Sequence, residues 1–150
     1  MRAREIMVSP VVTVSEECSL EEAAKLMFER NVGCLVVVNK QGDACGIVTE
    51  SDFAAKEKAI PFSVTRFPQV LGEWMPTDGV ERVYSAARRI KVRDIMTRDL
   101  ETLKEDDTVD TVLKRMLKTG YHRLPILKGR KPIGVVTRHD LLKLLLTRVS

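Results

Sequence analysis

The 150-residue sequence is 44% hydrophobic and 31% charged, which is typical of a soluble globular protein with one core or two small cores that share a surface. Its longest apolar runs are far shorter than the roughly 20 residues that cross a bilayer, and its N-terminus leads into no secretory signal, so we expect a cytoplasmic protein without a membrane span. The formal net charge of +4 favours anionic partners, including nucleotides, nucleic acid and acidic protein surfaces.

The first third of the chain predicts a short strand, a helix, two strands and the start of another helix. Ser19 and Glu22 have the spacing of a capping box, and apolar residues then recur at three- and four-residue intervals, so we expect an amphipathic helix over residues 19–30. Residues 34–39 and 45–49 form two largely apolar runs separated by turn residues, and they predict two strands, with a second helix beginning directly after the second of them.

The middle of the chain, residues 61–90, is predicted to be more than a flexible linker. Residues 61–68 are too apolar for such a linker, so we expect them to pack on another part of the protein. A shared apolar face predicts a helix over residues 80–90. We interpret Trp74 as an aromatic that covers the protein's own core, although a contact with a partner is the alternative.

The last third repeats the order of elements of the first. The sequence predicts a helix over residues 108–119, ended by Gly120, then strands at 124–127 and 133–137 and a helix over 141–147. The order of elements is therefore the same at both ends of the chain.

The two ends also share sequence. The segment GIVTESDF at residues 46–53 recurs as GVVTRHDL at 134–141, which is 88 positions later. The segment REIM at residues 4–7 recurs as RDIM at 93–96, which is 89 positions later. The chain is therefore divided into a first repeat, residues 1–60, an inter-repeat segment, residues 61–90, and a second repeat, residues 91–150.

The repeated segment carries a hydroxyl and a carboxylate where a strand gives way to a helix. Thr49 and Thr137 end the predicted strands, and Asp52 and Asp140 follow three residues later. Free amide hydrogens at a helix start attract anions, a threonine hydroxyl can donate to a phosphate oxygen, and a carboxylate can accept both hydrogens of a ribose diol. Helix capping is the simpler interpretation of one copy, but the recurrence in matching surroundings favours a nucleotide site.

These residues, with the upstream Ile-Met pairs and the His-Arg-Leu-Pro start of one strand, resemble the cystathionine-β-synthase-type (CBS) domain family. The resemblance covers nearly the whole chain apart from the middle segment. It implies an α/β protein with two CBS repeats, each with a small three-stranded sheet and two main helices, packed by pseudo-two-fold symmetry. It also implies two clefts for AMP, ADP, ATP or S-adenosylmethionine, a homodimer, and a regulatory role towards an enzyme, channel or transporter.

The resemblance assigns roles to positions of this sequence. Those expected to contact ribose are Asp52 and Asp140. Those expected near phosphate are Thr49, Thr137, Ser51, His139, His122 and Arg123. Those expected near adenine are Pro10, Val11 and Val12 in one cleft and Asp99, Leu100 and Glu101 in the other.

The residues also predict that the two clefts differ. Arg138 lies beside Thr137, and its planar guanidinium suits phosphate oxygens. Glu50 lies at the matching position beside Thr49, where a like charge opposes a phosphate. We therefore expect the cleft with Asp140 to bind phosphorylated nucleotides more tightly than the cleft with Asp52.

Three other interpretations are alternatives to a non-catalytic ligand sensor that acts on a partner protein. The basic C-terminal repeat leaves a nucleic-acid-binding protein open, although the sequence has no zinc finger or glycine-rich RNA motif. A CBS-pair scaffold without ligand is a further alternative. For an enzyme the sequence offers neither a phosphate-binding loop nor a nucleophile paired with a base, and we expect no catalytic residue, catalytic cofactor or metal. The three cysteines lack metal-ligand spacing and are expected to be reduced and structural.

Overall fold

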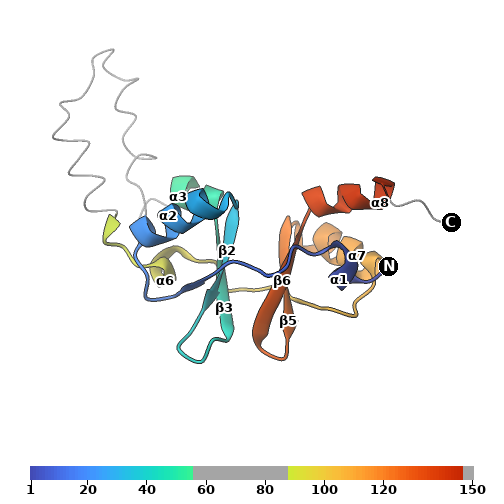
Figure 1. The fold of residues 1–150 in the computed structure, drawn as a ribbon, viewed down its shortest axis with the longest axis horizontal. Coiled ribbons are helices and arrows are strands. Elements are labelled where there is room, and N and C mark those ends of the chain that lie inside the picture. Colours follow the sequence, from blue (N-terminus) through green and yellow to red (C-terminus); the bar gives the residue numbers. More distant parts are fainter. Residues whose placement is uncertain (56–87, 147–150) are drawn as a thin grey trace, which may run out of the picture.

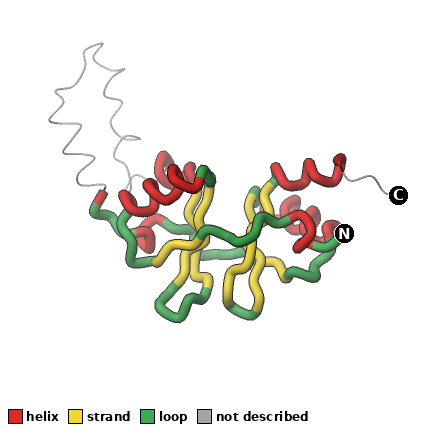
Figure 2. Tube along the Cα trace, in the orientation of Figure 1, coloured by secondary structure: helices red, strands yellow, loops and turns green. Residues whose placement is uncertain are grey.

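The computed structural model describes residues 1–55 and 88–146. It contains two three-stranded sheets that face each other in the middle of the molecule, with helices on their outer sides (Figures 1 and 2). The predictions for residues 61–68, for Trp74 and for a helix over 80–90 fall wholly or mainly outside the described residues. Of the helices that are described, none has the length and apolar character to cross a bilayer.

The first repeat has the predicted order of elements. Strand β1 (Thr13–Ser15) pairs in parallel with β2 (Cys34–Val38), which pairs antiparallel with β3 (Ala44–Thr49). Helix α2 (Leu20–Arg30) makes the crossover between the parallel strands, and α3 (Glu50–Ala55) follows β3 directly.

The second repeat has the same topology. The strands β4 (Leu103–Lys104), β5 (Arg123–Lys128) and β6 (Lys131–Thr137) form its sheet, and α7 (Val109–Thr119) makes the crossover. The last helix differs in detail from the prediction for residues 141–147. It begins earlier, as a 3₁₀ turn η2 (His139–Leu142), and only then becomes α8 (Lys143–Leu146).

The ends of the crossover helices confirm the cap residues. The side chain of Ser19 accepts a hydrogen bond from the Glu22 amide, and Glu22 reaches back to the Ser19 amide, as a capping box requires. The side chain of Thr108 caps α7 by accepting a hydrogen bond from the Thr111 amide. Gly120 ends that helix with a φ of 74°, a conformation that glycine adopts without steric cost.

Two short helices were not predicted, and each packs in the core of the other repeat. Helix α1 (Ala3–Ile6) buries Ala3 and Ile6 against residues of the second repeat such as Leu103. Helix α6 (Val92–Ile95) buries Val92 and Ile95 in the core of the first repeat. The two repeats are therefore joined by an exchange of their first helices.

The exchange explains why a glycine and an Ile-Met pair recur together. A Cβ on Gly134 would lie 2.5 Å from the Met7 sulfur, and a Cβ on Gly46 would lie 2.5 Å from the Met96 sulfur. Each methionine side chain therefore occupies the space that the side chain of any residue other than glycine would fill on the last strand of the other repeat. Because real Cβ atoms essentially never approach a heavy atom so closely, an alanine at either position would require the methionine to move.

A third, smaller core lies between the two sheets. It consists of Cys34, Ile47 and Val135, with Val11 and Leu100 packed against it. These residues come from both repeats, so the faces of the two sheets contact each other directly.

Candidate ligand-binding clefts

Two clefts lie at the boundary between the repeats. One, of about 220 Å³, contains Asp52 and is called the Asp52 cleft below. The other, of about 450 Å³, contains Asp140 and is called the Asp140 cleft. Each of the positions that the CBS resemblance assigns to ligand binding, and Arg138, lines at least one of them.

The predicted residues divide between the clefts as follows. The Asp52 cleft holds Thr49, Ser51, Asp52, Asp99, Leu100 and Glu101. The Asp140 cleft holds Thr137, Arg138, His139, Asp140, Pro10, Val11 and Val12. His122 and Arg123 line both.

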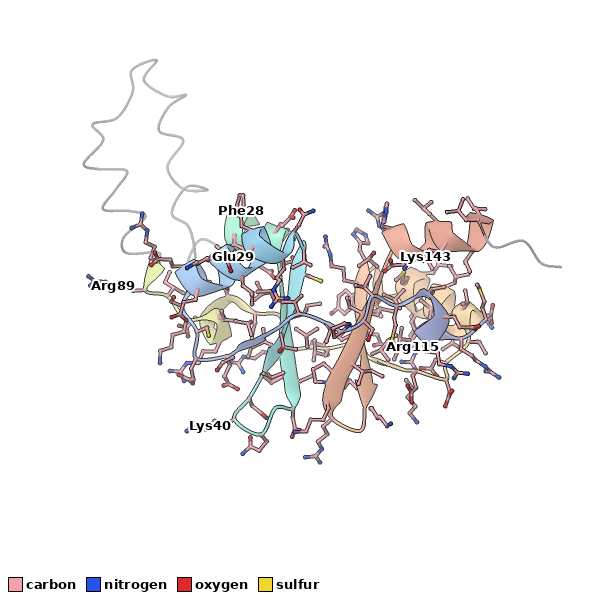
Figure 3. The ribbon with its side chains drawn as sticks, viewed as in Figure 1. Phe28, Glu29, Lys40, Arg89, Arg115 and Lys143 are labelled. Atoms are coloured by element: carbon pink, nitrogen blue, oxygen red, sulfur yellow. The ribbon has the colours of Figure 1, made fainter. Side chains whose placement is uncertain are left out.

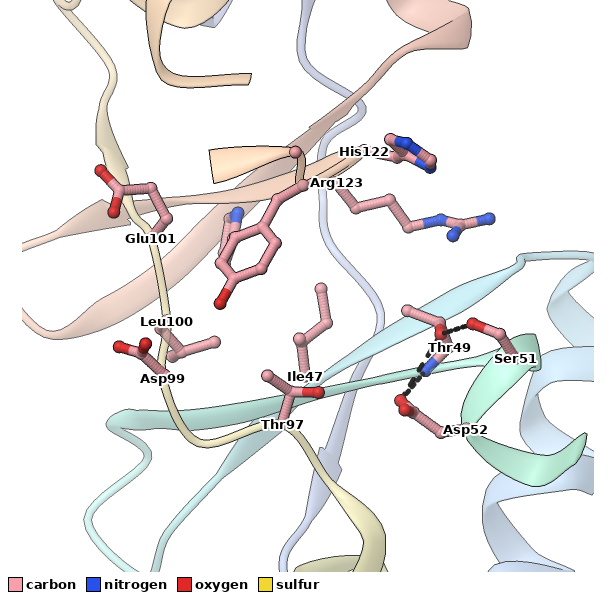
Figure 4. A pocket seen from close by; sticks show the side chains of 13 residues that line it. Ile47, Thr49, Ser51, Asp52, Thr97, Asp99, Leu100, Glu101, His122 and Arg123 are labelled. Carbon is pink, nitrogen blue, oxygen red and sulfur yellow. Dashed lines mark hydrogen bonds between the residues drawn. The ribbon is translucent and has the colours of Figure 1, made fainter. Parts of the chain in front are cut away.

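Each cleft is built from both repeats. In the Asp52 cleft the end of β3 faces the segment after α6 and the loop before β5, which belong to the second repeat (Figure 4). In the Asp140 cleft the end of β6 faces the segment before β1 and the loop before β2. A change in the relative position of the repeats therefore changes the shape of both clefts.

The threonine and aspartate have the same geometry in both repeats. An oxygen of Asp52 accepts hydrogen bonds from the Thr49 amide at 2.9 Å and the Thr49 hydroxyl at 3.4 Å (Figure 4). The corresponding distances from Asp140 to Thr137 are 2.8 Å and 3.1 Å. Each threonine–aspartate pair therefore makes the local hydrogen bonds that the capping interpretation predicts. These bonds do not exclude ligand binding, because a carboxylate has about four lone-pair sites.

Asp140 is held from its other side as well. It is 3% exposed, and its second oxygen lies 3.1 Å from the ammonium group of Lys143. That ammonium also donates to the carbonyl of Ile6, 2.9 Å away at the end of α1. The carboxylate thus has a fixed position at the floor of its cleft, which favours recognition of a ligand with fixed hydroxyl positions.

The second repeat supplies the arginine and histidine side chains of both clefts. Arg123 pairs with Thr137 in the second sheet, whereas Cys34 pairs with Thr49 at the equivalent position of the first. Likewise, Arg138 and His139 line the Asp140 cleft where the first repeat has Glu50 and Ser51. The arginine and histidine of the Asp52 cleft therefore reach it from the opposite repeat.

The walls assigned to adenine also differ between the clefts. Pro10 and Val12 line the Asp140 cleft, and at the equivalent positions of the Asp52 cleft are Asp99 and Glu101. In Figure 4 these two carboxylates lie at the end of the cleft opposite to Thr49. The Asp52 cleft is therefore both smaller and more acidic.

Glu50 does not line the Asp52 cleft, although it follows Thr49 directly. Its carboxylate instead lies beside Gly33, 3.2 Å from the position of a Cβ there, because the Glu50 amide pairs with the Gly33 carbonyl and continues the sheet. Any effect of its charge on a ligand in that cleft acts from outside the cleft wall.

Sequence reasoning also missed some lining residues. In the Asp140 cleft these include Asn31, Val32 and Gly33, and in the Asp52 cleft they include Gly120 and Tyr121. Both groups form the loop between the crossover helix and the next strand. The signal for Gly120 and Tyr121 is the adjacent His122 in the same loop. The signal for the other group is that Gly33 is the equivalent of His122 in the first repeat.

The cysteines have no features of reactive or metal-binding thiols. All three are free, and burial raises the pKa of Cys18, Cys34 and Cys45, that of Cys45 to about 11 with help from its bond to Glu16. A raised pKa lowers the fraction of nucleophilic thiolate. Within residues 1–55 and 88–146 no group of three histidine, cysteine or acidic side chains is placed to hold a metal ion.

Comparison with solved structures supports the architecture. The CBS domain of a CBS domain containing membrane protein from Sphaerobacter thermophilus is 38% identical, with a TM-score of 0.81, and the match covers 99% of this chain and 90% of that one. The CBS domain pair of protein MJ0100, in complex with 5′-methylthioadenosine and S-adenosyl-L-methionine, is 25% identical, with a TM-score of 0.71 over 97% of this chain and 95% of that one.

Sequence relatives give the same result. The uncharacterized protein MJ1426 of Methanocaldococcus jannaschii is 31% identical, and the match covers 97% of this chain and 92% of that protein. MJ1404 of the same organism is also 31% identical over 95% of this chain, but the chain spans only 31% of its length. The sequence-family model of the CBS domain matches residues 3–58 and again residues 92–147. The chain therefore belongs to the CBS domain family, as a tandem pair of CBS domains.

Proposed function

We propose that this chain is a non-catalytic regulatory module that binds adenosine-containing ligands in its two clefts and changes a partner protein through the resulting conformational change. One observation carries the proposal: the same threonine–aspartate pair lies at the end of a strand in each repeat and faces a cleft built from both repeats. The bound 5′-methylthioadenosine and S-adenosyl-L-methionine in the similar domain pair of MJ0100 support this ligand class.

Each part of a nucleotide has a matching group in the clefts. The ribose hydroxyls donate to Asp52 or Asp140, and the hydroxyls of Thr49 or Thr137 rotate away from the aspartate to donate to phosphate oxygens. The base lies against the segment before β1 or the segment after α6. Because the two walls of a cleft belong to different repeats, a ligand that fits one arrangement of the repeats shifts the population towards it.

The Asp140 cleft binds phosphorylated nucleotides more tightly in this proposal. Its wall carries Arg138 and His139, and its volume is about 450 Å³ against about 220 Å³ for the other cleft. The Asp52 cleft contains Asp99 and Glu101, whose charges oppose a phosphate. The side chain of Glu101 is in part compensated by Arg115, 3.8 Å away.

Thermal unfolding in the presence of AMP, ADP, ATP, S-adenosylmethionine and GTP tests the ligand class. An adenosine compound at about 100 times its dissociation constant should stabilise the protein by about 2.7 kcal/mol. The double variant Asp52→Asn/Asp140→Asn is the control, because asparagine retains an acceptor for the threonine amide but loses the carboxylate. An equal rise for wild type and this variant, or no rise with any adenosine compound, contradicts the proposal, and the latter result favours a scaffold without ligand.

The module is also proposed to form a homodimer through its crossover helices. Phe28 on α2 is 91% exposed (Figure 3), and Leu117 at the equivalent position of α7 is 85% exposed. Large apolar side chains at two symmetry-related positions suit a two-fold interface with a second copy. Phe28→Glu with Leu117→Glu should convert a dimer to a monomer in sedimentation velocity, and Lys104→Glu on β4 should not. A wild-type monomer at micromolar concentration contradicts this proposal.

A further inference from the structure

Arg123 lies between the two clefts. It lines both of them, and its side chain is half-buried. One terminal nitrogen of its guanidinium lies 3.0 Å from the position that a Cβ would have on Gly33, a residue of the Asp140 cleft wall. In Figure 4 the same side chain extends toward the end of the Asp52 cleft that holds Thr49 and Ser51.

The equivalent position of the first repeat carries no arginine. The equivalent residue of the first repeat is Cys34, and the residue equivalent to His122 is Gly33. Because Gly33 has no side chain, the guanidinium can lie against its backbone at the boundary between the clefts. An alanine there would approach the terminal nitrogen to 3.0 Å and require it to move.

We propose that the two clefts share the Arg123 guanidinium, so that an anionic ligand in one cleft weakens the binding of an anionic ligand in the other. The inference rests on the proposed function and adds a rule for how the two sites interact. A guanidinium binds phosphate with parallel hydrogen bonds in one plane, so it cannot make its full set of bonds to two phosphates in different directions.

The residues around Arg123 determine which cleft retains it. The Asp140 cleft has a second arginine, Arg138, so it fills first with a nucleotide and draws Arg123 towards it. The Asp52 cleft is then left with His122 as its remaining basic side chain among the described residues, together with Asp99 and Glu101. The second nucleotide therefore binds to a cleft that has lost its arginine.

Calorimetric titration with AMP and with adenosine tests the inference. Asp140→Asn and Asp52→Asn each leave one functional cleft, and their dissociation constants define how each cleft binds alone. In wild type the second AMP should bind about tenfold more weakly than the Asp52 cleft binds AMP in the Asp140→Asn variant, a ratio within the usual range of coupling between sites. Two molecules of adenosine, which has no phosphate, should bind independently.

Arg123→Met separates sharing from direct repulsion between two phosphates. The variant should bind AMP more weakly in each cleft but show no coupling, because the shared group is gone. Arg30→Met, which removes an exposed charge outside both clefts, should keep the tenfold coupling.

Four results would overturn the inference, and the last of them would also overturn the proposed function. Independent binding of two AMP molecules to wild type, or equal coupling for adenosine and AMP, overturns the sharing of Arg123 and leaves the proposed function intact. Coupling that persists in Arg123→Met assigns it to repulsion and has the same consequence. Absence of binding by AMP and adenosine together overturns both this inference and the proposed function.

Discussion

Replacement of Gly134 by alanine should lower the free energy of unfolding by about 1–3 kcal/mol, the usual cost of adding volume to a packed core. The new methyl group would lie 2.5 Å from the sulfur of Met7 and 3.1 Å from the Val8 carbonyl oxygen. The methionine can move in part, but the carbonyl is fixed because Val8 and Val135 exchange backbone hydrogen bonds of 2.9 and 3.1 Å. Urea unfolding followed by circular dichroism measures the change.

A double-mutant cycle identifies the cause of this loss. Met7→Ala removes the side chain that the new methyl group meets, so Met7→Ala/Gly134→Ala should be more stable than the sum of the single effects predicts, by about 0.5–3 kcal/mol. Gly46→Ala with Met96→Ala provides the matched experiment in the other repeat, where the distance to sulfur is also 2.5 Å. Simple additivity in both cycles would contradict the packing of each methionine against the opposite glycine.

The sequence was a good guide to the fold wherever a pattern is local. The capping box at Ser19 and the turn at Gly120 involve neighbours in the chain, so their side-chain chemistry predicts the helix ends directly. Helices α1 and α6 are four residues long, which is too short for a periodic apolar pattern. Their exchange depends on contacts about a hundred residues apart, such as the backbone bond from Ala3 to Asp107, and no local pattern encodes these.

In the candidate clefts, too, the sequence predicts contacts between neighbours in the chain but not contacts between the repeats. Thr49 and Asp52 are three residues apart at a strand end, so their partnership could be predicted from sequence alone. The wall opposite to them comes from the other repeat, and the CBS resemblance was needed to assign it. The position of Arg123 between both clefts, and that of Glu50 outside the Asp52 cleft, depend on how side chains cross the boundary between repeats. Only coordinates give that information.

Asp140→Asn should weaken the binding of the first AMP molecule at least tenfold, whereas Asp52→Asn should change it less than threefold. The loss of a charged acceptor for the ribose hydroxyls costs about 1.5–3 kcal/mol, which corresponds to a tenfold or larger effect. The two variants differ because the first molecule enters the cleft that contains Arg138 and His139. Calorimetric titration at fixed salt measures both constants, and equal losses for the two variants would contradict the predicted difference between the clefts.

Asp140 also has a structural role, and Lys143→Met separates it from ligand recognition. This variant removes the ammonium group 3.1 Å from the carboxylate and leaves Asp140 and Thr137 in place. Because Asp140 is 3% exposed, loss of its cationic neighbour should destabilise the protein without ligand by about 1–3 kcal/mol. AMP affinity should stay within threefold of wild type. If Lys143→Met instead weakens AMP as much as Asp140→Asn does, the aspartate acts on the ligand through the shape of its cleft, and direct recognition of ribose is wrong.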